Sequence, residues 1–306
     1  MDWAEELDRC AGEYLPDLEI KSDETMSRHT SFRIGGPARR MAFPKTGEQL
    51  VLLTDFAHKC GARPLVIGNG TNLLVPDEGL DRLVIDTSAG LNRLEMGAAE
   101  TQVTAEAGIS LARLADFAQK RGLAGLEFAH GIPGTVGGAL CMNAGAYGGE
   151  MAQVVEQVTL LDPECGVKIL SGAEMKFGYR RSILTDHPDW VVLHAVFRLY
   201  PGDGAEIRAR MEELMGKRKA SQPLEWPSAG STFKRPKGNF AGTLIDQCGL
   251  KGLTVGGAQV SEKHAGFLIN RGGATFADVT GLIAQVQERV LAATGVHLEP
   301  EVKIVG

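Results

Sequence analysis

The chain has 306 residues, enough for two or three packed units, and its 43% hydrophobic and 23% charged residues are typical of a folded protein. This composition excludes a disordered tail, a coiled coil and a collagen-like fibre. Lys and Arg number 32 against 38 Asp and Glu, a formal net charge of −6, so the chain is poorly suited to wrapping nucleic acid through its phosphates.

Neither secretion nor a metal centre is indicated. The first ten residues, MDWAEELDRC, are acidic and amphipathic and lack the basic start and apolar stretch of a secretion signal. Residues 128–149 are nearly uncharged but hold seven glycines, so they predict a glycine-rich loop region rather than a membrane span. The five cysteines are scattered, and the seven histidines show no metal-binding spacing. We therefore expect a cytoplasmic protein with reduced thiols and no metal ion.

The first part of the chain predicts mixed α/β structure. Short apolar runs predict strands at 39–43, 64–67 and 83–86. Thr46 is placed to cap a helix with apolar residues at helical spacing, and Gly61 is placed to end it.

A second part is expected from about residue 101 and a third from about residue 201. In the second part, strands are predicted at 101–107, 154–162 and 191–200, and a helix between Ser110 and Gly122. After a Pro-Gly-Asp-Gly linker, helices are predicted at 205–220, at 241–248 and between Thr275 and Gly295, and a strand at 302–305. Thr275 with Asp278 forms a capping-box pattern.

The sequence Gly68-Asn69-Gly70 directly follows a predicted strand. Glycines at such a turn let backbone N–H groups approach an anion without interference from a Cβ atom. This is not a Rossmann fingerprint, because the third glycine of G-x-G-x-x-G is missing and no helix is predicted after it. A plain strand-to-turn connection is the alternative.

A second glycine-rich stretch covers 131–138 and continues through 143–148. So many glycines raise the entropic cost of ordering the chain, which is tolerated where backbone must lie against a flat or phosphorylated ligand. Thr135 can add a hydroxyl there. The alternative is a cluster of turns in a surface loop.

A third stretch, 228–236, carries two hydroxyls around Gly230 and is followed by basic residues. Together with the basic end of the predicted helix at 205–220, it makes a local positive concentration that suits a small polyanion such as a nucleotide diphosphate. A solvated basic loop is the alternative. No G-x-S-x-G elbow and no P-loop sequence is present, which argues against hydrolase and P-loop functions.

Eight short segments, taken in order, span nearly the whole chain. They are TSFRIGG (30–36), GNGTNL (68–73), GIPGTVGG (131–138), NAGAYG (143–148), YRRS (179–182), PSAGS (227–231), AGFLIN (265–270) and LEPEV (298–302). Each is weak alone, but the ordered set resembles the UDP-N-acetylenolpyruvoylglucosamine reductases (MurB). The short connection between Arg181 and Trp190 resembles the type II branch of that family.

The resemblance implies an α+β fold with a two-subdomain FAD-binding region of the vanillyl-alcohol-oxidase (PCMH) type. The implied subdomains are 1–95 and 96–200, followed by a substrate-binding domain at 201–306. It also implies an oxidoreductase of peptidoglycan synthesis that uses FAD and NADPH. Its small-molecule substrate is the enolpyruvyl ether of a UDP-sugar, and we expect a monomer with no nucleic-acid partner and no membrane insertion.

The resemblance also carries over site residues. Ser231 is implied as the proton donor, with Arg180 and Glu301 polarising the substrate carboxylate, Glu301 in its protonated form; alone, either would usually be a surface residue. The implied FAD-binding residues are Arg33, Gly35, Gly68, Asn69, Gly70, Thr71, Asn72, Leu73, Gly131, Pro133, Gly134, Thr135, Gly138, Asn143 and Gly145. The implied substrate-binding residues are Tyr147, Lys219, Lys234 and His264, with Arg218 as an alternative to Lys219.

Three other functions compete with this prediction. A flavin oxidase of the same cofactor fold would reduce oxygen and would often hold FAD covalently. A sugar-nucleotide-binding regulator with an inactive flavin site would consume no NADPH. A classical Rossmann dehydrogenase is disfavoured by the missing third glycine.

Overall fold

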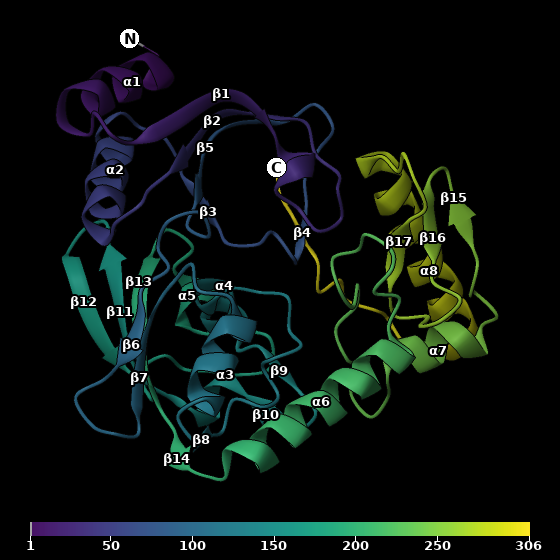
Figure 1. The fold of residues 1–306 in the computed structure, drawn as a ribbon. Coiled ribbons are helices and arrows are strands. Elements are labelled where there is room, and N and C mark those ends of the chain that lie inside the picture. The colour runs from purple at the N-terminus through teal and green to yellow at the C-terminus, as the bar shows by residue number, and fades with distance from the viewer. Residues whose placement is uncertain (1) are drawn as a thin grey trace. The chain divides into compact units, whose positions relative to one another are not determined.

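The computed structural model describes residues 2–306 (Figure 1). The chain divides into two compact units, and neither is continuous in sequence. Unit 1 comprises the segment up to Ser22, Arg39–Asn69 and Arg82–Gly216, and unit 2 comprises Asp23–Ala38, Gly70–Asp81 and Lys217–Gly306. The predicted division of the chain into 1–95, 96–200 and 201–306 stays a prediction. Met1, the first residue of the first predicted subdomain, lies outside the described residues.

The N-terminal part forms a four-stranded sheet in the order β1-β2-β5-β3, in which β3 and β5 run parallel. Its strands are β1 (Glu19–Thr25), β2 (Pro37–Phe43), β3 (Leu65–Ile67) and β5 (Leu80–Asp86). Helices α1 (Trp3–Tyr14) and α2 (Gly47–Lys59) pack against each other. Leu7 of α1, Leu50 and Leu53 of α2 and Ile85 of β5 belong to one buried cluster, so burial of apolar helix faces holds this part together.

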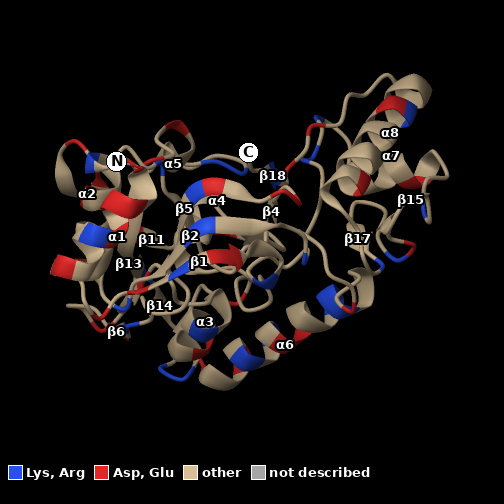
Figure 2. Ribbon diagram, turned by 90° about the horizontal axis from the view of Figure 1, so that it is seen from above, with Lys and Arg blue, Asp and Glu red and all other residues tan. Residues whose placement is uncertain are grey.

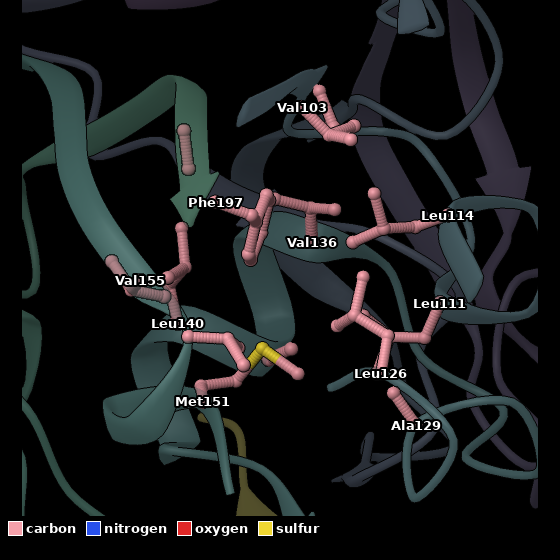
Figure 3. Close-up of a cluster of buried hydrophobic side chains, with 14 of the residues drawn as sticks. Val103, Leu111, Leu114, Leu126, Ala129, Val136, Leu140, Met151, Val155 and Phe197 are labelled. Carbon is pink, nitrogen blue, oxygen red and sulfur yellow. The ribbon is translucent and has the colours of Figure 1, made fainter. Parts of the chain in front are cut away.

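A five-stranded antiparallel sheet in the order β12-β11-β13-β7-β6 forms the rest of unit 1. Its strands are β6 (Leu94–Met96), β7 (Gln102–Glu106), β11 (Val155–Asp162), β12 (Gly166–Ser171) and β13 (Val191–Arg198). Helix α4 (Val136–Met142) packs on β7 and β13, and α3 (Leu111–Gln119) shares the same buried cluster. Figure 3 shows Phe197 of β13 together with Val136 and Leu140 of α4 in this cluster.

Unit 2 has a three-stranded sheet, β15-β16-β17, covered by the last helix, α8 (Phe276–Thr294). Five apolar side chains along α8, from Val279 to Val290, are buried, and α7 (Ala241–Gln247) packs beside it. The strands are β15 (Thr254–Val255), β16 (Ala258–Val260) and β17 (Leu268–Asn270). A short parallel pair joins β4 (Leu73–Leu74) to β18 (Lys303–Ile304).

The remaining elements are short, apart from one long helix. They are β8 (Leu123–Ala124), β9 (Gly145–Ala146), β10 (Gly149–Glu150), α5 (Ile183–Asp186) and β14 (Tyr200–Pro201), with two 3-10 turns at Met26–Arg28 and Met151–Gln153. The long helix, α6 (Gly204–Ser221), runs from one unit into the next and carries both signs of charge along its length (Figure 2). Among residues 2–306 no helix is long and apolar enough to span a membrane.

The sequence predictions of α2, α3, α6, α7 and α8 and of the main strands are confirmed, with ends displaced by one to a few residues. The prediction of a loop throughout 128–149 is wrong, because residues 136–142 form α4. Glycine lowers helix propensity, but two features stabilise α4. Thr135 caps its N-terminus, and its side chains Val136, Ala139 and Leu140 are buried. The predicted strand at 302–305 is shorter, at Lys303–Ile304.

We expect Thr275→Ala to destabilise the protein by about 1 kcal/mol. Thr275 Oγ1 accepts from the Asp278 N–H at 3.1 Å, and Asp278 accepts from the Thr275 N–H at 3.0 Å, so the substitution removes half of a capping box. Urea unfolding measures the loss. Thr280→Ala is the control on the same helix, since the Thr280 hydroxyl bonds back to the Phe276 and Ala277 carbonyls of that helix and caps nothing. An equal loss of stability in Thr280→Ala would contradict the capping argument.

Candidate functional site

The two predicted glycine turns meet within unit 1. Asn69 Nδ2 donates to the Pro133 carbonyl at 3.3 Å, and a Cβ atom on Gly68 would lie 2.9 Å from Cγ2 of Thr135. Only a glycine therefore fits at position 68 beside the second turn. Gly134 is also fixed, because its carbonyl accepts from the Leu111 N–H at the start of α3. Backbone from two distant segments thus forms one small glycine-lined surface.

Asn143 connects the second glycine stretch to the turn that carries Arg180. Its side chain is buried, with Nδ2 donating to the Gly178 carbonyl at 3.1 Å and Oδ1 accepting from the Ala152 N–H at 2.9 Å. Gly178 and Arg181 close that turn by exchanging backbone hydrogen bonds. The predicted FAD contact of Asn143 stays a prediction, but its side chain holds the Gly178 carbonyl at the start of the turn that contains Arg180.

Tyr147 lies at the tip of the β9–β10 hairpin, where it and Gly148 both have positive φ. This is the geometry of a tight two-residue hairpin turn, a position that usually takes Asn or Gly. The side chain of Tyr147 is 42% exposed. A bulky aromatic side chain is therefore exposed at a position that costs conformational energy, and its contact with a substrate stays a prediction.

Four predicted site residues adopt the left-handed backbone conformation. The φ angles are 57° at Arg33, 42° at Asn143, 55° at Tyr147 and 55° at Arg180, and only Asp23 and Lys176 join them among the described non-glycine residues. Each such residue costs roughly 1–3 kcal/mol unless its surroundings enforce it, and such strain gathers at ligand sites. The left-handed backbone at Arg33, Tyr147 and Arg180 cannot be recognised from the sequence, because none of these residue types favours it, whereas Asn143 adopts it readily at the end of α4.

The first predicted motif and the second half of the Gly68–Leu73 motif lie side by side in unit 2. The Ser31 N–H donates to the Gly70 carbonyl at 3.2 Å, and the Gly36 N–H donates to the Pro76 carbonyl at 2.8 Å. Gly35 has φ 132°, and a Cβ atom there would lie 2.8 Å from Cβ of Val75. Asn72 extends the arrangement, since its Nδ2 donates to the Glu301 carbonyl at 3.1 Å.

Ser231 and Glu301 both adjoin Thr232 in unit 2, Ser231 along the chain and Glu301 through a backbone hydrogen bond. The Glu301 N–H donates to the Thr232 carbonyl at 2.7 Å, and the Thr232 N–H donates to the Gly266 carbonyl at 2.8 Å. Ser231 pairs with Phe267 across the same short ladder. The buried Thr232 side chain accepts from the Leu268 N–H at 3.1 Å, so this residue, which the sequence analysis did not single out, fixes the local backbone.

His264 and Ser231 flank the same glycine. A Cβ atom on Gly266 would lie 3.2 Å from His264 Nδ1 and 3.5 Å from Ser231 Oγ. Nδ1 of His264 accepts from the Gly266 N–H at 3.1 Å, so the neutral ring carries its proton on Nε2. Burial lowers the pKa of this imidazole below its ordinary value of 6.5. His264 therefore has a neutral ring at neutral pH, with Nδ1 bound to the Gly266 N–H and the proton on Nε2.

We expect the stability of the protein to fall as the pH drops below about 6.5, partly through His264. Because the pKa of His264 is lower in the folded chain, the unfolded chain binds the proton more readily in that range. Burial also lowers the pKa of His194. Urea unfolding at about pH 7.5 and pH 5 should show a smaller loss in His264→Gln and in His194→Gln than in the parent protein. Identical pH profiles for all three proteins would contradict this account.

The two predicted lysines of the substrate site already make contacts within unit 2. Lys234 forms an ion pair with Glu299. The carbonyl of Lys219, near the end of α6, accepts from Lys263 Nζ at 2.7 Å, which ties the end of the helix to the loop that holds His264. The exposed side chain of Lys219 extends from a fixed helix end. Its role as a diphosphate contact stays a prediction.

The structure thus groups the predicted residues by unit. Unit 1 holds Gly68, Asn69, Gly131, Pro133, Gly134, Thr135, Gly138, Asn143, Gly145, Tyr147 and Arg180, and unit 2 holds Arg33, Gly35, Gly70, Thr71, Asn72, Leu73, Lys219, Ser231, Lys234, His264 and Glu301. The meeting of Arg180 with Ser231 and Glu301 stays a prediction. From residue 2 onward, no group of three His, Cys, Asp or Glu side chains is arranged to hold a metal ion.

Two family models match the chain. Residues 38–170 match an FAD binding domain, and residues 222–305 match the UDP-N-acetylenolpyruvoylglucosamine reductase C-terminal domain. The predicted α+β fold and its FAD-binding region are thereby confirmed. The close approach of Gly68 to Thr135 leaves no room for a side chain at this turn, as expected where main chain must lie against a dinucleotide.

Several relatives match over almost their whole length. The chain is 50% identical to the UDP-N-acetylenolpyruvoylglucosamine reductase of Caldanaerobacter subterraneus subsp. tengcongensis over 96% of each chain. It is 47% identical to that of Clostridioides difficile over 94% of each. The crystal structure of UDP-N-acetylenolpyruvylglucosamine reductase (MurB) from Thermus caldophilus superimposes with a TM-score of 0.80 at 37% identity, over 94% of this chain and 99% of that one.

Proposed function

The chain belongs to the UDP-N-acetylenolpyruvoylglucosamine reductases, a family of FAD-dependent oxidoreductases, and from that premise we propose its reaction. It reduces UDP-N-acetylglucosamine enolpyruvate to UDP-N-acetylmuramate for peptidoglycan synthesis, with NADPH as the electron source. The observation that supports FAD binding is the contact between the two glycine turns, in which the Asn69 side chain donates to the Pro133 carbonyl.

FAD would be held by backbone from both turns. Gly68 and Gly134 have no Cβ atom to keep diphosphate oxygens away from the main chain, and Thr135 adds a hydroxyl at the start of α4; Gly131 is assigned together with them. The remaining residues assigned to FAD are Arg33, Gly35, Asn69, Gly70, Thr71, Asn72, Leu73, Pro133, Gly138, Asn143 and Gly145. Of the motif from 68 to 73, Gly68 and Asn69 belong to unit 1, and the residues from Gly70 onward belong to unit 2.

Reduced FAD, when bound, supplies the hydride that adds to the terminal carbon of the enol ether. Negative charge then develops on the neighbouring carbon and its carboxylate, and this carbon must receive a proton. Ser231 donates that proton from its hydroxyl, and Arg180 and Glu301 bind the carboxylate where the charge develops. A hydroxyl is a weak acid, so these neighbours must assist it.

The support for these roles is local. Ser231 and Glu301 are fixed to the same residue, Thr232, and the His264 ring borders the same glycine, Gly266, as Ser231 does. Arg180 is presented from a strained turn that Asn143 holds in place. Tyr147, His264, Lys219 and Lys234 would line the substrate, with the lysines nearest its diphosphate. We also propose that the protein acts in the cytoplasm and as a monomer.

The proposal is tested with purified protein. It should be yellow, and it should oxidise NADPH only when the enolpyruvyl sugar nucleotide is supplied. Mild denaturation should release the flavin. Flavin retained after denaturation together with oxygen consumption would point to an oxidase, and bound flavin without NADPH oxidation would point to a regulator; either result would overturn the proposal.

A further inference from the structure

Three of the eight motif segments meet in unit 2 at one side chain, that of Asn270. Its Nδ2 donates to the Phe32 carbonyl at 3.1 Å, in the segment 30–36. Its backbone N–H donates to the Pro227 carbonyl at 2.9 Å, in the segment 227–231. Asn270 itself ends the third of these segments and strand β17. The side chain is buried, and the proposed reaction gives it no role.

The orientation of the Asn270 amide is fixed by its other contacts. Oδ1 accepts from the Gly272 N–H at 2.9 Å and from the Ala274 N–H at 3.2 Å. Because both of these groups are donors, the oxygen must face them, and the amide nitrogen must face the Phe32 carbonyl. This position therefore needs an acceptor and a donor on one short side chain. An ionised aspartate of the same size would keep the acceptor and lose the donor.

The bond to Phe32 bears directly on Arg33, one of the residues assigned to FAD. The Phe32 carbonyl and the Arg33 N–H belong to the same peptide group, and in a trans peptide they point in opposite directions. The carbonyl accepts from Asn270, and the N–H donates to the Thr30 carbonyl at 3.0 Å. The peptide group before Arg33 is therefore held at both ends.

Arg33 has a φ angle of 57°, which costs energy in a residue other than glycine and persists only where the surroundings enforce it. Phe32 and Ile34 on either side are buried in one cluster of unit 2, and the Ile34 carbonyl accepts from Thr30 Oγ1 at 2.9 Å. Arg33 itself is exposed between them. These contacts enforce the left-handed backbone and leave the guanidinium side chain accessible to a ligand.

We propose that Asn270 is a positioning residue that holds Arg33 in the conformation in which it binds FAD. This inference rests on the proposed function, which assigns Arg33 to the cofactor. Without the bond from Asn270, the peptide group before Arg33 loses one of its two anchors, and the strained backbone relaxes. The guanidinium group then leaves the position in which it meets FAD. Asn270 is buried and acts only through Arg33.

A double-mutant cycle tests this dependence. Asn270→Asp removes the N–H donor and keeps the acceptor for Gly272 and Ala274, so we expect FAD to bind the apoprotein about tenfold more weakly. Arg33→Ala should lose at least as much affinity. The double variant should bind no more weakly than Arg33→Ala, because Asn270 acts through Arg33. Quenching of flavin fluorescence gives each Kd. Asn92→Asp, at an exposed asparagine of unit 1, adds the same charge and should match the parent.

The cycle separates positioning from general stabilisation of the fold. If the losses of the two single variants add in the double variant, Asn270 acts independently of Arg33, and the proposal is overturned. It is also overturned if either Asn270→Asp or Arg33→Ala binds FAD as tightly as the parent. Failure of the parent protein to bind FAD would instead overturn the proposed function.

Hydrogen exchange in the parent protein gives a second test that does not depend on the folding of any variant. FAD should slow amide exchange in 30–36 and also in 271–274, a segment with no residue assigned to FAD. The N–H groups of Gly272 and Ala274 are bound to the Asn270 side chain, so they report how firmly it is held. Exchange in 271–274 that is the same with and without bound FAD would overturn the proposal.

Discussion

Ser231→Ala is expected to lower turnover by about two orders of magnitude or more while leaving flavin reduction by NADPH intact. The substitution removes the hydroxyl that we assign as proton donor and leaves the backbone pairing of Ser231 with Phe267 in place. NADPH should therefore still bleach the flavin. Adding the enolpyruvyl sugar nucleotide should then reoxidise it only slowly. Stopped-flow absorbance separates the two half-reactions.

The matched control is Ser221→Ala, in the same unit. Ser221 is an exposed serine whose hydroxyl donates to the Lys217 carbonyl of its own helix at 2.9 Å. Its turnover should match that of the parent protein. Unchanged turnover in Ser231→Ala would remove Ser231 from the proton-donor role, and a slowed NADPH half-reaction would show that the substitution acts on the flavin site instead.

Gly68→Ala is expected to impair both folding stability and FAD binding. The added Cβ atom would lie 2.9 Å from Cγ2 and 3.0 Å from Cβ of Thr135, a buried β-branched residue that also caps α4. Thr135 cannot move away without giving up that cap, so we expect a loss of about 1–3 kcal/mol in the free energy of unfolding. The Kd for FAD should rise by about tenfold or more, because the turn that binds the diphosphate is displaced.

Gly47→Ala is the control for this substitution. Gly47 begins α2, has no positive φ, and a Cβ atom there would meet nothing within 4 Å. Alanine favours a helix over glycine, so stability should stay level or rise slightly. If Gly68→Ala were as stable as Gly47→Ala and bound FAD equally well, the close approach of the two turns would have no functional importance.

Local signals were enough to predict several elements. The helices α2 and α8 begin at capping threonines, Thr46 and Thr275, and α8 ends at a left-handed glycine, Gly295, because these contacts involve residues three or four apart. Helix α4 was missed because its stability comes from burial against β7 and β13, far away in the sequence. The eight short motifs supported the family assignment, since their order along the chain carries information that no single motif has.

The sequence pattern could not predict which segments of the chain make up each of the two units. Segments 23–38 and 70–81 belong with the C-terminal part of the chain through contacts such as the Asn72 side chain with the Glu301 carbonyl. Such contacts join residues far apart in the chain and produce no periodic pattern in the sequence. The contact of the Asn143 side chain with the Gly178 carbonyl and the left-handed backbone at Arg180 likewise could not be predicted from the sequence.

The chain passes from unit 1 to unit 2 between Asn69 and Gly70, in the middle of the turn assigned to FAD. Both glycine turns meet within unit 1, through Gly68 and Asn69, so the energy of a molecule bound there opposes the unfolding of that unit. Starving such a protein of flavin should expose unit 1 to proteases, so cofactor supply would set how long each copy survives.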